Sequence, residues 1–259
     1  NKLILPFTKL LIYPKAIDAY DLLKCGADPN GMKPINGFSE LAHLYGFKPD
    51  TGVLRQLGLK KNGYIVMRTE PVKANYFNGP EKSVLEDVIP LLPEMPIVLF
   101  PRTEEQKKRF ERFDNVIIPE RPLDSLSLLY HARLMIGAGG TMNREAIALG
   151  TPTISTYPGK LLAVTKWLVE LGLEFHSTDP VEVADIAEKL TFLNGSYRNY
   201  LRSVVSGMEN PMEVILREIE AYEESGSFVT SPDSGDLWSY VGLDESRKQE
   251  HGNGHEVKL

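Results

Sequence analysis

The clearest structural signal in the chain is LMIGAGGTMNREA at residues 134–146. A short apolar run, typical of a buried strand, leads into three glycines and then into residues that favour a helix. Glycine has no Cβ, so its backbone approaches a ligand closely and adopts positive φ readily. A helix that begins near Thr141 presents unpaired N–H groups and its positive dipole end, which favours an anion such as phosphate. Thr141 is a candidate N-cap, and a tight packing turn without a ligand is the alternative for the whole segment.

Similar strand-then-helix units lie on both sides of this segment. Short apolar runs predict strands at residues 64–68, 97–100, 115–118, 134–137, 152–156 and 173–176. Helix-length segments occupy residues 83–92, 104–113, 123–131, 143–149, 161–171, 181–193, 197–205 and 212–222. The alternation predicts an α/β fold, a doubly wound, Rossmann-like parallel sheet with helices on both faces.

The rest of the chain divides into segments of different character. We interpret residues 1–58, rich in glycine and proline, as the end of an incomplete N-terminal domain and its linker. The strand predicted at residues 10–14 needs a sheet from elsewhere, so we expect the chain to be the back part of a longer protein. Pairing with a later strand of the same chain is the alternative. We assign residues 59–210 to the Rossmann-like domain, 211–224 to a return helix and 225–259 to a disordered tail.

The composition excludes several classes of protein. The 259 residues are 42% hydrophobic, which is enough for a core and excludes wholesale disorder. Lys+Arg total 29 against 35 for Asp+Glu, so a net charge of −6 argues against nucleic acid as a partner. The single cysteine, Cys25, forms no internal disulfide and suits a reducing cytoplasm. No apolar run approaches the ~18 residues of a membrane-spanning helix, so we expect no integral membrane segment.

The predicted strand order places an arginine beside the glycine segment. In the common doubly wound order the first and fourth strands are neighbours, and ligands bind beyond their carboxyl ends. Arg68 ends the first predicted strand, so we expect it to face the same crevice as the glycines and to neutralise a phosphate. A surface ion pair with Glu70 is the alternative. Arg102, after the second strand, is a weaker candidate because it also fits an ordinary helix entry.

A nicotinamide cofactor is not expected. Gly137 and Gly139 match the first two glycines of the dinucleotide fingerprint, but Met142 stands where the third belongs. The strand before them is also the fourth of the fold and not the first. No Cys/His cluster indicates a metal site, so we expect neither metal nor cofactor.

Five short motifs occur in order along the chain. They are PERPLDSL (119–126), LYHA (129–132), GGTMNREA (139–146), LGTP (149–152) and YPGK (157–160). The series resembles the C-terminal half of the UDP-N-acetylglucosamine 2-epimerase group and of GT-B glycosyltransferases. It more closely resembles the uncharacterised, largely archaeal domain-of-unknown-function family 354, from about residue 1 to residue 222. The GT-B fold has two Rossmann-like domains that face a cleft, and the C-terminal one holds the nucleotide sugar, here expected to be a UDP-sugar.

The resemblance implies roles for residues of these motifs. Gly139, Gly140 and Thr141 would bind the donor diphosphate, and Glu145 would accept hydrogen bonds from the ribose hydroxyls. For Glu145, compensation of the helix dipole is the alternative. Lys160 is weighed evenly between a phosphate ligand and a solvated lysine. The candidate binding residues are Arg68, Arg121 (near the base), Gly139, Gly140, Thr141, Asn143, Arg144, Glu145 and Lys160.

The resemblance also implies a function. It indicates a glycosyltransferase, or a sugar-nucleotide epimerase or hydrolase, whose catalytic residues are not assigned. The family's proteins carry most of another domain before the equivalent of Asn1, so we expect catalysis to need that domain or a partner chain. The alternative is a non-catalytic subunit that binds a nucleotide sugar or supplies the donor domain to a partner. A homodimer is a further expectation.

Overall fold

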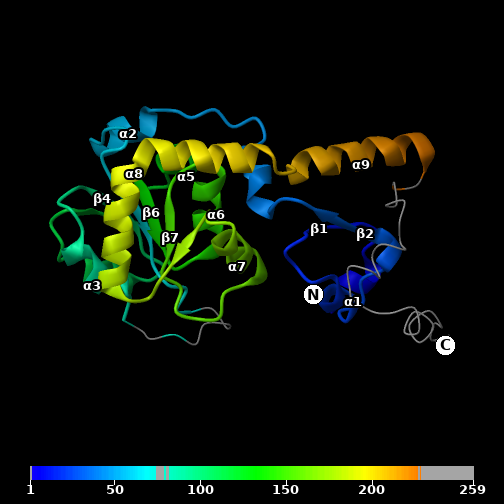
Figure 1. The fold of residues 1–259 in the computed structure, drawn as a ribbon, viewed down its shortest axis with the longest axis horizontal. Helices are drawn as coiled ribbons and strands as arrows, with labels where there is room; N and C mark the ends of the chain where they lie inside the picture. Colours follow the sequence, from blue (N-terminus) through cyan, green and yellow to red (C-terminus); the bar gives the residue numbers. More distant parts are fainter. Residues whose placement is uncertain (1, 74–78, 80–81, 227, 229–259) are drawn as a thin grey trace. The chain divides into compact units, whose positions relative to one another are not determined.

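The computed structural model describes residues 2–73, 79, 82–226 and 228 (Figure 1). It contains two compact units. The sheet unit is Glu40–Met208, and the terminal unit combines the segment up to Ser39 with the segment from Glu209. The disordered tail predicted at residues 225–259 lies almost entirely outside the described residues. Among the helices that the structure describes, none is both long and apolar enough to cross a bilayer.

The sheet unit is built on six parallel strands. Their order is β5-β4-β3-β6-β7-β8. The bounds are β3 Ile65–Arg68, β4 Ile97–Phe100, β5 Val116–Ile117, β6 Leu134–Gly137, β7 Thr153–Ser155 and β8 Phe175–His176. The chain steps outward from β3 to β5, returns to β6 on the other side of β3, and steps outward again. This confirms the doubly wound sheet and places its switch point between β3 and β6.

Helices cover both faces of this sheet (Figure 1). Their bounds are α2 Gly52–Leu57, α3 Leu85–Val88, α4 Glu104–Phe110, α5 Ser125–His131, α6 Gly140–Ala148, α7 Ala163–Glu170 and α8 Pro180–Ser206. Successive strand residues point to opposite faces. Val66 therefore packs in one core with residues of α2, α5 and α6, whereas Ile65 and Met67 pack in the other with residues of α3, α4 and α8.

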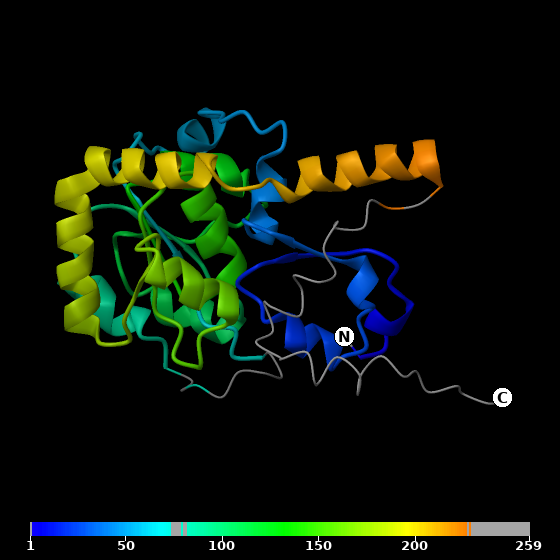
Figure 2. The ribbon, with the colours of Figure 1, turned by 45° about the vertical axis from the view of Figure 1, so that its right-hand side comes forward.

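Helix α8 replaces two predicted helices. The sequence predicts separate helices at residues 181–193 and 197–205, but α8 is continuous and sharply bent (Figures 1 and 2). Gly195 and Ser196 lie midway along it, and a glycine–serine pair is a common cause of a kink. Ser196 Oγ also donates a hydrogen bond to the carbonyl oxygen of Leu193 at 2.8 Å. The bend lets one helix pack on both α3 and α6.

The sheet unit begins earlier than the domain boundary predicted at residue 59. Residues 40–58 look like a linker because glycine and proline interrupt their apolar pattern. In the structure Val53 and Leu54 of α2 are buried in the same core as Leu128 and Leu129 of α5. These apolar side chains make the segment part of the sheet unit.

In the terminal unit, β1 (Leu11–Pro14) pairs in parallel with β2 (Met32–Ile35), and α1 (Ala19–Leu23) connects them. The predicted strand at residues 10–14 thus pairs within the chain, which was the alternative reading. The sequence conceals β2 because Pro34 interrupts it. Short 3-10 helices occupy Leu5–Phe7 and Pro29–Gly31 in this unit, whereas Ser39–Leu44, at the start of the sheet unit, and Ile89–Leu91, within it, are two more.

Helix α9 (Pro211–Ser225), the predicted return helix, belongs to the terminal unit. The Glu209 N–H donates to the carbonyl oxygen of Asn36 at 2.9 Å, and the Asn36 N–H donates to Glu209 Oε2 at 2.6 Å. Lys33 of β2 forms an ion pair with Glu218, whose side chain is buried. Glu209 and helix α9 therefore pack with the described part of the N-terminal segment.

Candidate functional site

The glycine turn, residues 137–141, joins β6 to α6 at the switch point of the sheet. Arg68 of β3 pairs with Gly137 of β6, and the Ala138 N–H donates to the carbonyl oxygen of Arg68 at 3.0 Å. Helix α6 begins at Gly140, and its N-cap residue, Gly139, makes no side-chain hydrogen bond. The prediction that Thr141 caps this helix is wrong, because the N-cap is Gly139 and Thr141 is the second residue of the helix. The first N–H groups of α6 have no side-chain cap.

The glycines of the turn lie close to neighbouring side chains and do not adopt unusual backbone angles. Gly137, Gly139 and Gly140 are absent from the positive-φ residues of the described chain. A Cβ on Gly139 would lie 2.5 Å from Arg102 Nη2, and one on Gly140 would lie 2.5 Å from Arg144 Nη1. Of the two reasons that favour glycine here, close approach therefore applies and positive φ does not.

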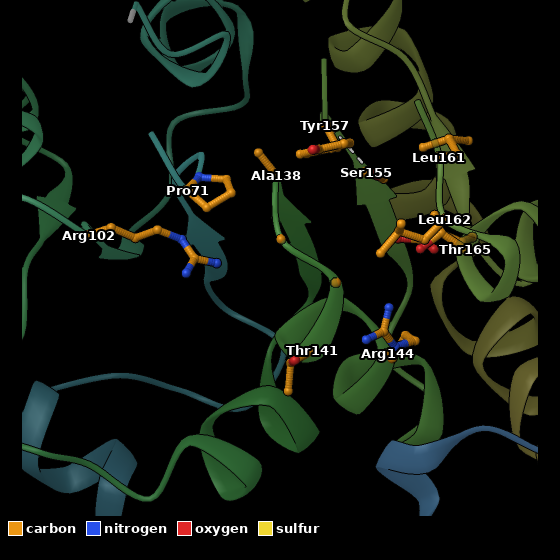
Figure 3. A pocket seen from close by; sticks show the side chains of 13 residues that line it. Pro71, Arg102, Ala138, Thr141, Arg144, Ser155, Tyr157, Leu161, Leu162 and Thr165 are labelled. Atoms are coloured by element: carbon orange, nitrogen blue, oxygen red, sulfur yellow. Dashed lines mark hydrogen bonds between the residues drawn. The ribbon is translucent and has the colours of Figure 1, made fainter. Parts of the chain in front are cut away.

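A cleft of about 220 Å³ opens beside the glycine turn (Figure 3). Its lining residues are Pro71, Arg102, Ala138, Gly139, Gly140, Thr141, Arg144, Ser155, Tyr157, Leu161, Leu162, Thr165 and Glu174. They come from the end of β7, from the loops after β3, β4, β6 and β7, from α6 and α7, and from the residue before β8. The carboxyl ends of neighbouring parallel strands meet at this edge of the sheet.

Two arginines flank the turn, with Arg102 on one side and Arg144 on the other (Figure 3). Arg102 Nε donates to the carbonyl oxygen of Thr69 at 3.0 Å. Arg144 Nη2 donates to Glu40 Oε1 at 2.7 Å, while Arg144 Nε is buried without a hydrogen-bond partner among the described residues. The cleft thus combines two guanidinium groups with the N-terminus of a helix, an arrangement that favours an anion.

A buried carboxyl group also lines the cleft. Glu174 is 2% exposed, and its Oε1 accepts a hydrogen bond from Asn143 Nδ2 at 2.9 Å. Burial raises the pKa of Glu174 to about 7, although the Asn143 amide and Arg144 partly offset this rise. Near neutral pH the Glu174 carboxyl group in the wall of the cleft is therefore present in both its charged and its uncharged form.

The volume of the cleft limits what it encloses. Pockets that bury a drug-sized molecule span ~300–1,000 Å³. At about 220 Å³ the cleft is smaller than this, so a larger ligand would extend beyond it. Among the described residues, no group of three or more His, Cys, Asp or Glu side chains is arranged to hold a metal ion.

Comparison with known proteins identifies the family. The model of the family described as "Protein of unknown function (DUF354)" matches residues 1–224. The chain belongs to the DUF354 family. Uncharacterized protein MJ0665 from Methanocaldococcus jannaschii is 40% identical over 197 residues, which are 73% of this DUF354 chain and 56% of that protein. The chain therefore spans little more than half the length of this relative.

Solved structures share the fold of this DUF354 protein. Anabaena Alr3699/HepE, in complex with UDP, aligns with a TM-score of 0.58 and 19% identity over 86% of this chain and 65% of its own. UDP-GlcNAc 2-epimerase from M. jannaschii aligns with a TM-score of 0.58 and 20% identity, over 83% of this chain and 62% of its own. At this identity the comparison establishes the fold alone. It confirms the predicted GT-B type of Rossmann-like domain.

Four of the candidate binding residues of this DUF354 chain line the cleft, namely Gly139, Gly140, Thr141 and Arg144. Arg68 lies beside the turn but does not line the cleft, because its Nη1 faces the carbonyl oxygens of Phe100 and Pro101, each at 3.4 Å. Burial and the nearby Arg102 charge lower the pKa of Arg68 to about 10.

The other four candidates lie outside the cleft lining. Asn143 is buried behind the turn and donates to the carbonyl oxygen of Gly137 at 3.0 Å. Glu145 Oε1 lies 2.8 Å from His43 Nδ1. Arg121 and Lys160 are exposed.

Sequence reasoning missed part of the cleft. Arg102, the weaker of the two candidate arginines, lines the cleft where Arg68 is expected from the sequence. Its position directly after β4 was the available signal. Tyr157 belongs to the YPGK motif, although only Lys160 of that motif was singled out. Glu174 and Thr165 carry no local motif, so no pattern along the chain could have found them.

Proposed function

We propose that this DUF354 chain binds a nucleotide sugar, with the donor diphosphate at the glycine turn between Arg102 and Arg144. The observation that carries the proposal is the cleft, in which an uncapped helix N-terminus and two guanidinium groups converge at the switch point of the sheet. Guanidinium groups and helix N-termini both bind phosphate oxygens through charge-assisted hydrogen bonds.

The fold comparisons support the chemical class of the ligand. Anabaena Alr3699/HepE has been solved with UDP and with UDP-glucose, and the M. jannaschii 2-epimerase with UDP-GlcNAc and UDP. A UDP-sugar is therefore the first ligand to test. The ribose would lie toward Glu145 and the base toward the loop that contains Arg121, as the family resemblance implies.

In the whole protein the proposed reaction is glycosyl transfer, or epimerisation or hydrolysis of a sugar nucleotide. The helix N-terminus and the arginines would offset negative charge that develops on the departing diphosphate. We propose that this reaction needs a second Rossmann-like domain, on a longer form of this chain or on a partner, to bind the acceptor. No separate cofactor or metal enters the proposal.

Calorimetric titration tests the binding step. The full chain is titrated with UDP-N-acetylglucosamine, UDP and uridine, and we expect the two diphosphates to bind and uridine to bind far more weakly. Gly140→Val fills the space beside Arg144 and should reduce affinity at least tenfold, whereas Gly207→Val, where a Cβ meets no close neighbour, should not. Equal binding of uridine and UDP, or unchanged binding by Gly140→Val, would contradict the proposal.

An activity assay separates catalysis from binding alone. The same chain is incubated with UDP-N-acetylglucosamine, and released UDP and the 2-epimer are measured. Turnover would reject a purely binding role. Binding without turnover, together with turnover after a second Rossmann-like domain is added, would support the requirement for that domain.

A further inference from the structure

A buried side-chain pair lies directly behind the glycine turn. Asn143 of α6 is 1% exposed and Glu174, before β8, is 2% exposed. The Asn143 amide nitrogen donates to the carbonyl oxygen of Gly137 at 3.0 Å and to Glu174 Oε1 at 2.9 Å. The Asn143 amide therefore links the end of β6 to the residue just before β8.

Each member of this pair has a buried oxygen atom with unused hydrogen-bonding capacity. Asn143 Oδ1 and Glu174 Oε2 have no hydrogen-bond partner among the residues that the structure describes. Both atoms are acceptors while Glu174 is ionised, so neither satisfies the other. A buried acceptor without a partner is costly.

One proton removes the mismatch. A protonated carboxyl group offers one acceptor and one donor, and a primary amide offers the same two functions in reverse. With a proton on Oε2, Glu174 can donate to Asn143 Oδ1 while Oε1 accepts from Asn143 Nδ2. The result is a cyclic acid–amide pair with both oxygens satisfied.

The charges around Glu174 make its proton sensitive to a bound anion. Burial raises the pKa of Glu174, and the Arg144 charge lowers it. Arg102 lines the same cleft, Tyr197 of α8 interacts electrostatically with Glu174, and His176 Nδ1 lies 3.0 Å from the carbonyl oxygen of Ser155. A bound diphosphate would offset the Arg144 charge and add negative potential, and both effects favour the protonated carboxyl.

We propose that Glu174 is a positioning residue whose protonated form holds the Asn143 amide, and through it the glycine turn, and that it takes up a proton when a diphosphate binds there. The second half of this statement rests on the proposed function.

The first test uses the ligand-free protein. Carbon-13 NMR of labelled glutamate carboxyls follows the ionisation of each group, and the Glu174 signal is the one lost in Glu174→Gln. We expect its midpoint near neutral pH. Glu86→Gln, which removes a buried carboxylate outside the cleft, should leave this signal unchanged. A Glu174 midpoint near 4.5, the ordinary value for glutamate, would overturn the proposal.

The second test measures proton uptake on binding. UDP-glucose is suitable because its diphosphate diester does not titrate near neutral pH. Calorimetry at pH 8 in two buffers of different ionisation enthalpy should show uptake of roughly half a proton by the wild type. Half a proton taken up on binding corresponds to an affinity that weakens about threefold per pH unit near pH 8. Glu174→Gln, whose amide can donate to Asn143 Oδ1, should bind without uptake, and Glu86→Gln should behave as the wild type.

The outcomes of the two tests are independent of each other. Uptake that persists unchanged in Glu174→Gln, or no uptake by the wild type, would overturn the coupling to the ligand. If UDP-glucose does not bind the wild type at all, the proposed function fails, and the NMR midpoint decides the acid–amide pair without it.

Discussion

His43 Nδ1 lies 2.8 Å from Glu145 Oε1, a contact between residues 102 positions apart in the chain. The neighbouring residue of α6, Arg144, pairs in the same way with Glu40 at 2.7 Å. Arg144 and Glu145, which are consecutive in α6, thus both contact the short 3-10 helix Ser39–Leu44 at the start of the sheet unit. A segment that looks like a linker therefore orients two residues of the glycine motif.

The flanking arginines give a first prediction. Replacing Arg102 or Arg144 by alanine should lower UDP affinity about 10- to 100-fold, because each loses a charge-assisted hydrogen bond worth ~1.5–3 kcal/mol. Arg55→Ala, at an exposed arginine of α2, is the matched control and should bind normally. Isothermal titration calorimetry provides the affinities. Wild-type affinity in both cleft variants would contradict an anion site between the two arginines.

The ribose contact proposed for Glu145 gives a second prediction. If this carboxylate accepts hydrogen bonds from the ribose hydroxyls, the wild type should prefer UDP over 2′,3′-dideoxy-UDP about tenfold. Glu145→Ala should bind both ligands equally, and competition binding measures the ratio. A preference that survives in Glu145→Ala would assign the ribose to other residues.

Packing behind the turn gives a third prediction. A Cβ on Gly137 would lie 2.5 Å from Asn143 Oδ1 and 2.7 Å from Met135 Cε, and all of these groups are buried. Gly137→Ala should therefore lower the free energy of unfolding by ~1–3 kcal/mol, the usual cost of overpacking. Urea denaturation measures this. Gly207→Ala, with only one contact at 3.5 Å, is the control.

The ionisation of Glu174 gives a fourth prediction, for stability against pH. Its pKa is raised from 4.5 to about 7 in the folded protein, so the folded state binds this proton more tightly than the unfolded state. The free energy of unfolding should fall as pH rises from 4.5 to 7 and then level, by roughly 3 kcal/mol at most. Urea denaturation of wild type and Glu174→Gln across this range isolates the effect. Parallel pH profiles for the two proteins would refute it.

Local sequence predicted the sheet well because each strand carries its own signal. Residues 65–68 and 134–137 are short apolar runs with a polar or glycine end, and their neighbouring positions follow from the general winding rule. The strand β2 had no such signal, because Pro34 lies within it. The prediction of two separate helices around Gly195 was wrong for a similar reason. The local break in the sequence pattern marks a bend within the single helix α8.

The sequence by itself determined the doubly wound sheet, its switch point and the glycine turn, because strand length, glycine placement and helix entry are properties of neighbouring residues. The tertiary structure alone decided which side chains enter the cleft. Arg68 ends β3 and Arg102 follows β4, and only packing turned one guanidinium toward carbonyl oxygens and the other into the cleft. Glu174 reaches the wall of the cleft, behind Asn143, from 31 positions along the chain. Such contacts depend on how distant segments pack, and no local pattern encodes them.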